Sequence, residues 1–302
     1  MNNTLCLRAP AKINLYLKVI NRREDGYHNL SSLMQMIGLY DELHFEETEN
    51  DLSLQIRNST LPADHSNLVL RAAHLLQTTM RSEGHVHKGA AIHLKKEIPV
   101  AAGLAGGSSD AVATLIGLNH LWKLNWPKEK LARLSEKLGS DLSFFFDGPT
   151  AWVTGRGEIV ESLQNPFKTW IILLNPGIPI STASVFQDFS TQNGLTKTET
   201  AIKISAKQGR PTLTEVYQHP HNDLERVTLD RVVELKRFKL RLRRVGGKLV
   251  LMSGSGPSVF ATFESHEQAT LAANQMWELE KESSLKIWVL PFLQKSPFLE
   301  YI

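Results

Sequence analysis

Apolar and polar residues alternate strictly from Lys12 to Val19. A period of two predicts a β-strand with one buried face, which Ile13, Leu15 and Leu17 share, and a polar face opposite it. Pro10 lies near the start of this strand, where an edge position or a bulge tolerates a residue without a backbone donor. The chain is therefore expected to begin with a half-buried strand that carries Lys12 and Asn14 on its polar face.

Further elements follow from shorter patterns. Apolar runs between turn residues predict strands at 43–45, 52–56, 91–94, 152–153, 159–160, 170–174, 249–252, 259–263 and 287–290. Helical periodicity predicts helices after an Asn67 cap and at 111–122, 127–138, 142–146, 223–238 and 267–280. Residues 26–29 are interpreted as a turn, and residues 187–215 are polar and predict no element. This mixture favours an α+β class.

The length of 302 residues is sufficient for two domains. The polar stretch 162–166 is the most plausible boundary, which divides the chain into domains at 1–163 and 164–302.

A glycine-rich segment, PVAAGLAGGSSDA at 99–111, leads directly into a predicted helix. Its glycines can adopt positive φ and fold around an anion, and the two serines and the aspartate are typical of helix starts. Free amides and the positive end of the helix dipole then favour a phosphate site. The Walker, dinucleotide and protein-kinase patterns are absent, so the loop belongs to another class. The alternative is a glycine-rich turn without a ligand.

Two charged residues are candidates for chemistry at such a loop. Lys12 lies on the polar face of the first strand, and Asp141 lies at the start of a short predicted helix. A carboxylate that orients a hydroxyl, beside a lysine that neutralises charge, is what phosphoryl transfer to an alcohol requires. The alternatives are a solvated lysine and a helix-capping aspartate, and the sequence alone does not show that the two residues meet.

Composition adds few constraints. The formal net charge of +3 suits an anionic substrate but does not single out nucleic acid. The single cysteine, Cys6, excludes an internal disulfide framework and a cysteine-cluster metal site, favours a reducing, cytoplasmic setting, and is expected in the core. No apolar run reaches the roughly 18 residues of a membrane span and no secretory signal is evident, so no membrane partner is expected.

A basic cluster at 236–248 competes with the phosphate-loop interpretation, because such runs also mark nucleic-acid binding. The rest of the chain lacks a matching basic stripe with interleaved aromatic residues. The cluster is therefore interpreted as a solvated helix or turn face, and no nucleic-acid partner is expected. Salt-sensitive RNA binding, as opposed to ATP turnover with a small alcohol, would separate the two hypotheses.

Three separated segments resemble the motifs of the kinases named for galactose, homoserine, mevalonate and phosphomevalonate (GHMP kinases). They are APAKINL at 9–15, the glycine-rich segment at 99–111, and LMSGSGP at 251–257. Within that superfamily the chain most resembles the 4-diphosphocytidyl-2-C-methyl-D-erythritol kinases, through AKINL, DGYH, GSDL, GRGE and NDLE at 11–15, 25–28, 139–142, 155–158 and 222–225. Another small-alcohol kinase, such as homoserine or mevalonate kinase, is the alternative, and 26–28 with Phe186 argue against it.

The resemblance implies a ribosomal-protein-like N-terminal domain with a left-handed βαβ unit, a ferredoxin-like C-terminal domain, and an active site between them. It also implies ATP-dependent phosphorylation, with Mg²⁺, of the 2-hydroxyl of cytidine diphosphate methylerythritol in the non-mevalonate route to isoprenoid precursors. Two positions depart from the family pattern. Ala105 replaces a frequent glycine, and Pro257 stands where serine or threonine is frequent.

The family motifs also imply roles for individual residues. Lys12 and Asp141 form the catalytic pair, and Ser109 is an indirect Mg²⁺ contact, although no convincing set of metal ligands is evident. The implied substrate contacts are Asn14, the cytosine-stacking pair Tyr27 and Phe186, the edge donor His28, and the diphosphate contact Thr182. The implied ATP contacts are Pro99, Gly103, Leu104, Ala105, Gly106, Gly107, Ser108 and Ser109, with Asn67 and Lys96 on the adenosine side.

Overall fold

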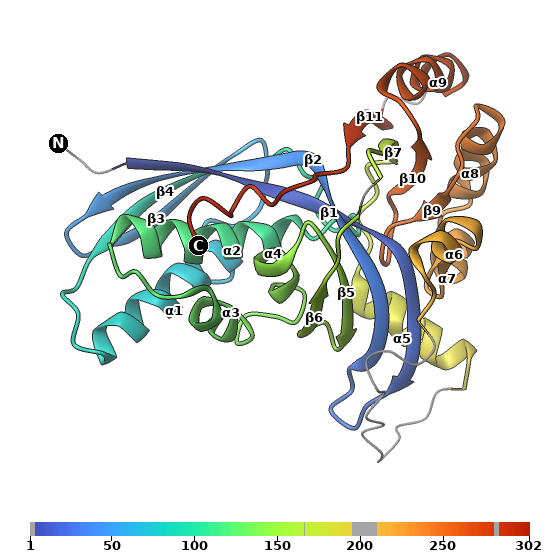
Figure 1. Cartoon of the computed structure of the whole chain (residues 1–302). Coiled ribbons are helices and arrows are strands. Elements are labelled where there is room, and N and C mark those ends of the chain that lie inside the picture. The colour runs from blue at the N-terminus through green and yellow to red at the C-terminus, as the bar shows by residue number, and fades with distance from the viewer. Residues whose placement is uncertain (1–3, 166, 195–209, 281–283) are drawn as a thin grey trace.

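Two β-sheets of different size organise the chain (Figure 1). A computed structural model describes residues 4–165, 167–194, 210–280 and 284–302. The larger sheet contains β1 (Thr4–Arg22), β2 (His28–Thr48), β3 (Leu52–Arg57), β4 (Gly89–Lys95), β5 (Thr150–Gly155), β6 (Ile159–Ser162) and β8 (His221–Asn222). The smaller sheet contains β7 (Trp170–Asn175), β9 (Val250–Met252), β10 (Val259–Phe263) and β11 (Lys286–Pro291).

The helices divide between the two sheets. Figure 1 shows one group below the larger sheet: α1 (Leu68–Ser82), α2 (Gly106–Leu121), α3 (Lys128–Ser135) and α4 (Ser143–Asp147). The other group lies on the side of the smaller sheet: α5 (Thr182–Gln192), α6 (Leu213–Gln218), α7 (Glu225–Arg231), α8 (Glu234–Arg244) and α9 (His266–Leu279). Among these helices, none combines the length and the apolar character that a bilayer crossing requires.

The larger sheet is built on the long antiparallel pair of β1 and β2, which spans the molecule (Figure 1). Its main path has the order β3-β4-β2-β1-β8, and β5 pairs with β2 and with β6. β3 and β4 are parallel neighbours joined through α1, which gives the expected βαβ unit. The register of β1 shifts between Pro10 and Ala11, which confirms that Pro10 lies at an irregularity of the ladder.

The smaller sheet has the order β11-β7-β10-β9 with antiparallel neighbours. In chain order this arrangement is 4-1-3-2, and with α8 and α9 packed against its strands it forms the expected ferredoxin-like unit. The C-terminal residues then return to the other half, where Phe298 is fully buried in the core below the larger sheet. We propose that the domain boundary lies near residue 164, between β6 and β7, where the chain passes from one sheet to the other.

Most of β2 was not predicted, because the sequence indicates a strand only at 43–45 and a turn at 26–29. The structure forms a strand from His28 to Thr48. Met34 and Met36 pack into the core below the larger sheet, whereas Leu33 and Ile37 pack into the core between the two sheets. A strand that is buried on both faces lacks the alternation of a half-buried strand, so its pattern gives no period of two.

Several local predictions were also wrong. α2 begins at Gly106, before the two serines, and its N-cap is Ala105 without a side-chain hydrogen bond. The helix predicted at 223–238 is two helices, α7 and α8, separated at Val232 and Val233. Cys6 is exposed, because it lies on the face of β1 opposite the buried Leu7. α5 and α6 occupy the ends of the segment 187–215, and residues 195–209 lie outside the described residues.

Candidate active site

A pocket of about 1110 Å³ opens where the two sheets meet. β1, the 25–28 turn, the glycine loop, residues 138–142 and the first turns of α5 all contribute to its walls. Every sequence-predicted site residue lines this pocket except Leu104 and Ser109. Leu104 is buried, and its carbonyl accepts a hydrogen bond from the Lys12 amide at 3.0 Å, so it ties the loop to β1. Ser109 is also buried, and its Oγ has no hydrogen-bond partner among the described residues.

The glycine loop has an unusual backbone. Ala101, Gly103 and Ala105 have φ values of +52°, +76° and +54°. An alanine in this left-handed region costs about 1–2 kcal/mol, and such strain is concentrated at functional sites. Ala105 therefore occupies a position where glycine would be free of strain. The loop leads directly into the N-terminus of the long helix α2, where free amides favour an anion.

We expect Gly103→Ala to weaken ATP binding by roughly 5- to 150-fold, which corresponds to about 1–3 kcal/mol of backbone strain. A Cβ at this position would lie 2.1 Å from the Ser253 carbonyl oxygen, so the loop must move away from the second half of the chain. Calorimetric titration of ATP measures the change. Gly84→Ala is the matched control, because Gly84 also has positive φ but no atom within 4 Å of the added Cβ. An unchanged ATP affinity for Gly103→Ala would contradict a phosphate role for the loop.

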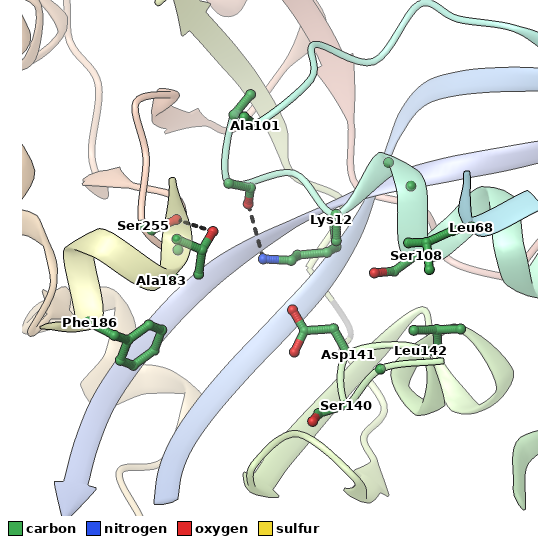
Figure 2. Close-up of a pocket in the computed structure, with 18 of the residues that line it drawn as sticks. Lys12, Leu68, Ala101, Ser108, Ser140, Asp141, Leu142, Ala183, Phe186 and Ser255 are labelled. Carbon is green, nitrogen blue, oxygen red and sulfur yellow. Dashed lines mark hydrogen bonds between the residues drawn. The ribbon is translucent and has the colours of Figure 1, made fainter. Parts of the chain in front are cut away.

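Lys12 is held in a fixed position beside the loop (Figure 2). Its side chain is buried, and Nζ donates to Asn14 Oδ1 at 2.7 Å and to the Gly103 carbonyl at 3.0 Å. Asn14 Nδ2 donates in turn to Ser32 Oγ at 2.8 Å, so the lysine is oriented by a chain of hydrogen bonds. Ser253 Oγ donates to the same Gly103 carbonyl at 2.8 Å, which joins the loop to the second half of the chain.

Asp141 faces Lys12 across the pocket. Figure 2 shows the Asp141 carboxylate pointing toward the Lys12 ammonium. Burial lowers the pKa of Lys12, and the negative charge of Asp141 opposes this shift. Asp141 precedes α4 and packs against the turn at Gly157, where a Cβ would lie 3.0 Å from Asp141 Oδ1. The structure thus brings together the two charged residues that the sequence could only propose as partners.

Aromatic side chains form the far end of the pocket. The rings of His28 and Phe186 stack with their centroids 5.0 Å apart and their planes at 25°. His28 Nε2 lies 2.6 Å from Ser190 Oγ, and burial lowers the pKa of His28. Tyr27 is 57% exposed at the turn between β1 and β2. The structure thus places Phe186 against His28, and a sandwich of cytosine between Tyr27 and Phe186 stays a prediction.

Comparison with known proteins agrees with this geometry. Residues 67–149 match the family model of the GHMP kinases N terminal domain, and residues 217–279 match that of GHMP kinases C terminal. The 4-diphosphocytidyl-2-C-methyl-D-erythritol kinase of Shouchella clausii is 41% identical over 274 residues, which are 89% of each chain. The enzyme of that name from Enterococcus faecalis is 40% identical over 87% of this chain and 91% of its own. The chain belongs to the 4-diphosphocytidyl-2-C-methyl-D-erythritol kinase family of the GHMP kinases.

Solved structures agree with the fold of this kinase. A crystal structure of 4-(cytidine 5'-diphospho)-2C-methyl-D-erythritol kinase superposes with a TM-score of 0.75 at 31% identity and covers 95% of this chain and 98% of its own. Homoserine kinase from Cytophaga hutchinsonii superposes with a TM-score of 0.70 at 17% identity over 97% of this chain and 95% of its own. The second similarity shows the shared two-domain fold alone.

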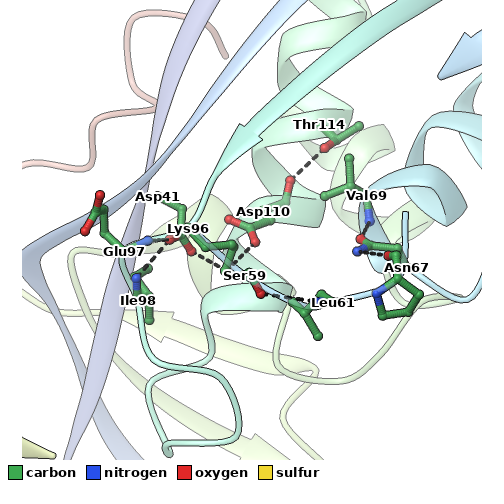
Figure 3. A network of polar contacts seen from close by, with 11 residues as sticks. Asp41, Ser59, Leu61, Asn67, Val69, Lys96, Glu97, Ile98, Asp110 and Thr114 are labelled. Atoms are coloured by element: carbon green, nitrogen blue, oxygen red, sulfur yellow. Dashed lines mark hydrogen bonds and ion pairs between the residues drawn. The ribbon is translucent and has the colours of Figure 1, made fainter. Parts of the chain in front are cut away.

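A buried triad of one lysine and two aspartates in this kinase flanks the glycine loop (Figure 3). Lys96 Nζ lies 2.5 Å from Asp41 Oδ2 and 2.7 Å from Asp110 Oδ2. Asp41 Oδ1 also accepts hydrogen bonds from the amides of Glu97 and Ile98 at 2.6 and 2.9 Å. Burial raises the pKa of Asp110 to about 8, although the charge of Lys96 opposes the shift. The triad joins β2, the end of β4 and the first turns of α2, so it fixes both ends of the loop.

Asp41 was not predicted as a site residue, because a single aspartate within an unpredicted part of a strand has no motif around it. Lys96 was predicted as an adenosine contact, and the structure commits its ammonium to two carboxylates while it still lines the pocket. Removing one member of a fully buried ion pair leaves an uncompensated charge. The triad therefore holds the loop in place, and removal of any one of its three side chains is expected to destabilise the loop.

Two other predicted contacts have structural partners. Asn67 caps α1, as predicted from the sequence, since its Oδ1 accepts from the Val69 amide at 3.0 Å and its Nδ2 donates to the Pro62 carbonyl at 2.9 Å. Thr182 Oγ1 lies 2.9 Å from Ser255 Oγ, and both residues line the pocket. These contacts account for the position of each side chain, and their roles toward ATP and substrate stay predictions.

Proposed function

We propose that this kinase transfers the γ-phosphoryl group of ATP to the 2-hydroxyl of 4-diphosphocytidyl-2-C-methyl-D-erythritol. The observation that carries the proposal is the position of Asp141 opposite Lys12, in the pocket that the glycine loop and the aromatic cluster share. The named activity of relatives that are about 40% identical over most of the chain supports the same substrate.

We assign a part in the reaction to each side of the pocket. The loop amides and the N-terminus of α2 receive the ATP phosphates. Asp141 orients the acceptor hydroxyl and takes its proton as the new oxygen–phosphorus bond forms and the bond to ADP breaks. Lys12, fixed by Asn14 and Gly103, neutralises negative charge on the transferring group. Positioning and charge neutralisation thus supply the catalysis, as phosphoryl transfer needs.

A magnesium ion that enters with ATP fits the donors that are present. The described residues contain no group of three His, Cys, Asp or Glu side chains arranged to hold a metal ion. Mg²⁺ keeps several waters and takes other ligands from substrate phosphates, so it needs few protein ligands. The buried Ser109 Oγ, which lacks a partner in the described structure, is the hydroxyl that we assign to an indirect contact. The ion would reduce the negative charge on the phosphates.

A panel of alcohols tests the proposed substrate. The purified protein is given ATP and Mg²⁺ with cytidine diphosphate methylerythritol, mevalonate, homoserine or galactose, and ADP release is measured. We expect turnover with the cytidine substrate and little with the other three. Preferred turnover of mevalonate or homoserine would show a different GHMP activity on the same fold.

The nucleic-acid hypothesis loses support from the structure. Most cations of the cluster 236–248 form ion pairs inside the molecule: Lys236 with Asp230, Lys239 with Glu225, Arg237 and Arg241 with Glu280, and Lys248 with Glu264. Four of these five cations lie on α8 and Lys248 follows it, and the pairs reduce the positive charge that is available to phosphates. Strong salt-sensitive RNA binding by the intact protein would restore this hypothesis.

Phe186→Ala is expected to raise the KM for the cytidine substrate by about one to two decades, because base–aromatic stacking contributes about 1–3 kcal/mol. The KM for ATP is expected to stay within twofold, since Phe186 lies at the end of the pocket away from Ser108 in the first turn of α2 (Figure 2). Phe167→Ala is a control, because Phe167 is exposed and does not line the pocket. An equal rise in the KM for ATP and in the KM for the cytidine substrate would contradict the stacking role.

A uridine analogue provides the second half of this test. A stacking surface accepts any base, so selectivity for cytosine must come from hydrogen bonds at the base edge. His28 is the predicted edge contact, and its pKa is lowered by burial, so the neutral ring is favoured. We expect the uridine analogue to be a poor substrate of the unmodified kinase. Equal use of the cytidine and uridine compounds would disprove the cytosine assignment.

A further inference from the structure

Arg156 lies at the tip of the β5–β6 hairpin and lines the large pocket. The register of β5 on β2 pairs Gly155 with Leu30, so this tip lies next to the turn that carries Tyr27. The next residue, Gly157, packs against Asp141. Arg156 thus lies between the proposed catalytic aspartate and the aromatic end of the pocket.

The Arg156 guanidinium has few partners. Its Cζ lies 5.3 Å from the centroid of the Tyr27 ring, a distance at which a cation is attracted to an aromatic face. Its Nε is buried and has no hydrogen-bond partner among the described residues. Its charge contributes to the lowered pKa of Asp25, which is already paired with Arg23. Within the described parts of the chain, no hydrogen bond or ion pair engages this guanidinium.

A second arginine, Arg210, also lies near β5, but its guanidinium is paired with a carboxylate. Arg210 lies over the Trp152 ring of β5 at 5.5 Å, and its Nη1 lies 2.8 Å from Glu161 Oε2. Arg210 is outside the large pocket. Both arginines therefore lie over an aromatic ring, but the side-chain donors of Arg156 have no partner among the described residues. A buried donor without a partner costs free energy unless a ligand satisfies it.

We propose that Arg156 is a substrate-positioning residue that holds the Tyr27 ring and donates hydrogen bonds to the diphosphate of the acceptor substrate. The inference rests on the proposed function, which supplies a substrate with both a base and a diphosphate. A guanidinium suits this task because its planar fork matches phosphate oxygens and its face packs on an aromatic ring. One side chain would thus couple recognition of the base to placement of the chain that carries the reacting hydroxyl.

Inhibition by CDP and by cytidine separates the two parts of this role. Both compounds are tested as competitive inhibitors of the wild-type kinase and of Arg156→Gln, against the cytidine diphosphate substrate. We expect Arg156→Gln to raise the inhibition constant of CDP about tenfold more than that of cytidine, because the variant loses a charge-assisted hydrogen bond to the diphosphate. The KM for ATP is expected to stay within twofold, because the proposed role of Arg156 concerns the acceptor substrate alone. Arg210→Gln is the matched control and is expected to leave both inhibition constants within twofold.

The ratio of the two inhibition constants decides the outcome, because a general loss of structure would weaken both compounds equally. An unchanged CDP-to-cytidine ratio in Arg156→Gln would overturn the diphosphate contact, even if both compounds bind more weakly. Thermal unfolding of the variant shows separately whether the fold is kept. Failure of the wild-type kinase to phosphorylate the cytidine diphosphate substrate would instead overturn the proposed function, whatever Arg156 does.

Discussion

Asp141→Asn is expected to lower kcat by about 10²–10⁴-fold, the usual contribution of a positioned general base. The amide keeps the shape of the carboxylate but cannot take the proton of the acceptor hydroxyl. It also removes the negative charge that faces Lys12 across the pocket. In a loose transition state little proton transfer from the acceptor hydroxyl has occurred, so the decrease in kcat is expected toward the lower end of this range.

Steady-state kinetics with the cytidine substrate and calorimetric titration of ATP together test this prediction. ATP affinity is expected to change by less than about threefold, because Asp141 is assigned to the acceptor and the loop is assigned to the phosphates. Asp147→Asn provides a matched control, since Asp147 ends α4 and pairs with Lys128 outside the large pocket. Wild-type kcat in Asp141→Asn would remove this residue from the mechanism.

The parts of the fold with a clean pattern were predictable. The alternation from Lys12 to Val19 lies within β1, and Asn67 caps α1 as expected. The first part of the long strand β2 was not predictable, because Leu33 and Met34 enter different cores and residues 28–40 have no exposed face. The start of α2 was misplaced, because left-handed backbone at Ala105 begins the helix in place of a serine cap. Local sequence preference gave way there to the geometry of the loop.

The site was predictable in its residue types but not in its assembly. The motifs identified Lys12, Asp141 and the glycine loop, yet only the fold shows that the first two face each other. Asp41 was missed, because its role arises from Lys96 and Asp110, which come from other elements. The stacking of His28 on Phe186 was missed for the same reason. Contacts between distant segments leave no local pattern, so sequence periodicity cannot reveal them.

The contacts of Lys12 explain why its position depends on both halves of the chain. The Gly103 carbonyl accepts hydrogen bonds from Lys12 Nζ and from Ser253 Oγ, and Ser253 belongs to the turn after β9. The Asn14 amide also donates to Ser253 Oγ at 3.3 Å. The ammonium is thus placed by β1, the loop and the C-terminal half together. A cation fixed in this way requires no reorganisation when charge develops on the transferring phosphoryl group.

Lys12→Met is therefore expected to lower kcat by about 10²–10³-fold, comparable to the loss of one preorganised donor to a developing charge. The substitution leaves Asn14 Oδ1 without its donor and removes one of the two donors to the Gly103 carbonyl, so ATP affinity is expected to fall as well, by a smaller factor. Lys18→Met is the control, because Lys18 lies on the same strand but is exposed. A rise in the KM for the alcohol with unchanged kcat would make Lys12 a binding residue only.

The pH dependence of the wild-type kinase gives a second measure of Lys12. The residue acts as a cation, so activity is lost as the pH rises through its pKa in the folded protein. Burial lowers that pKa from its usual 10.5, and Asp141 offsets part of the shift. As the pH rises, kcat/KM is therefore expected to begin its decline before pH 10.5 is reached. This decline reports the free enzyme and is expected to be absent from the residual activity of Lys12→Met. The same alkaline decline in Lys12→Met would assign it to another group.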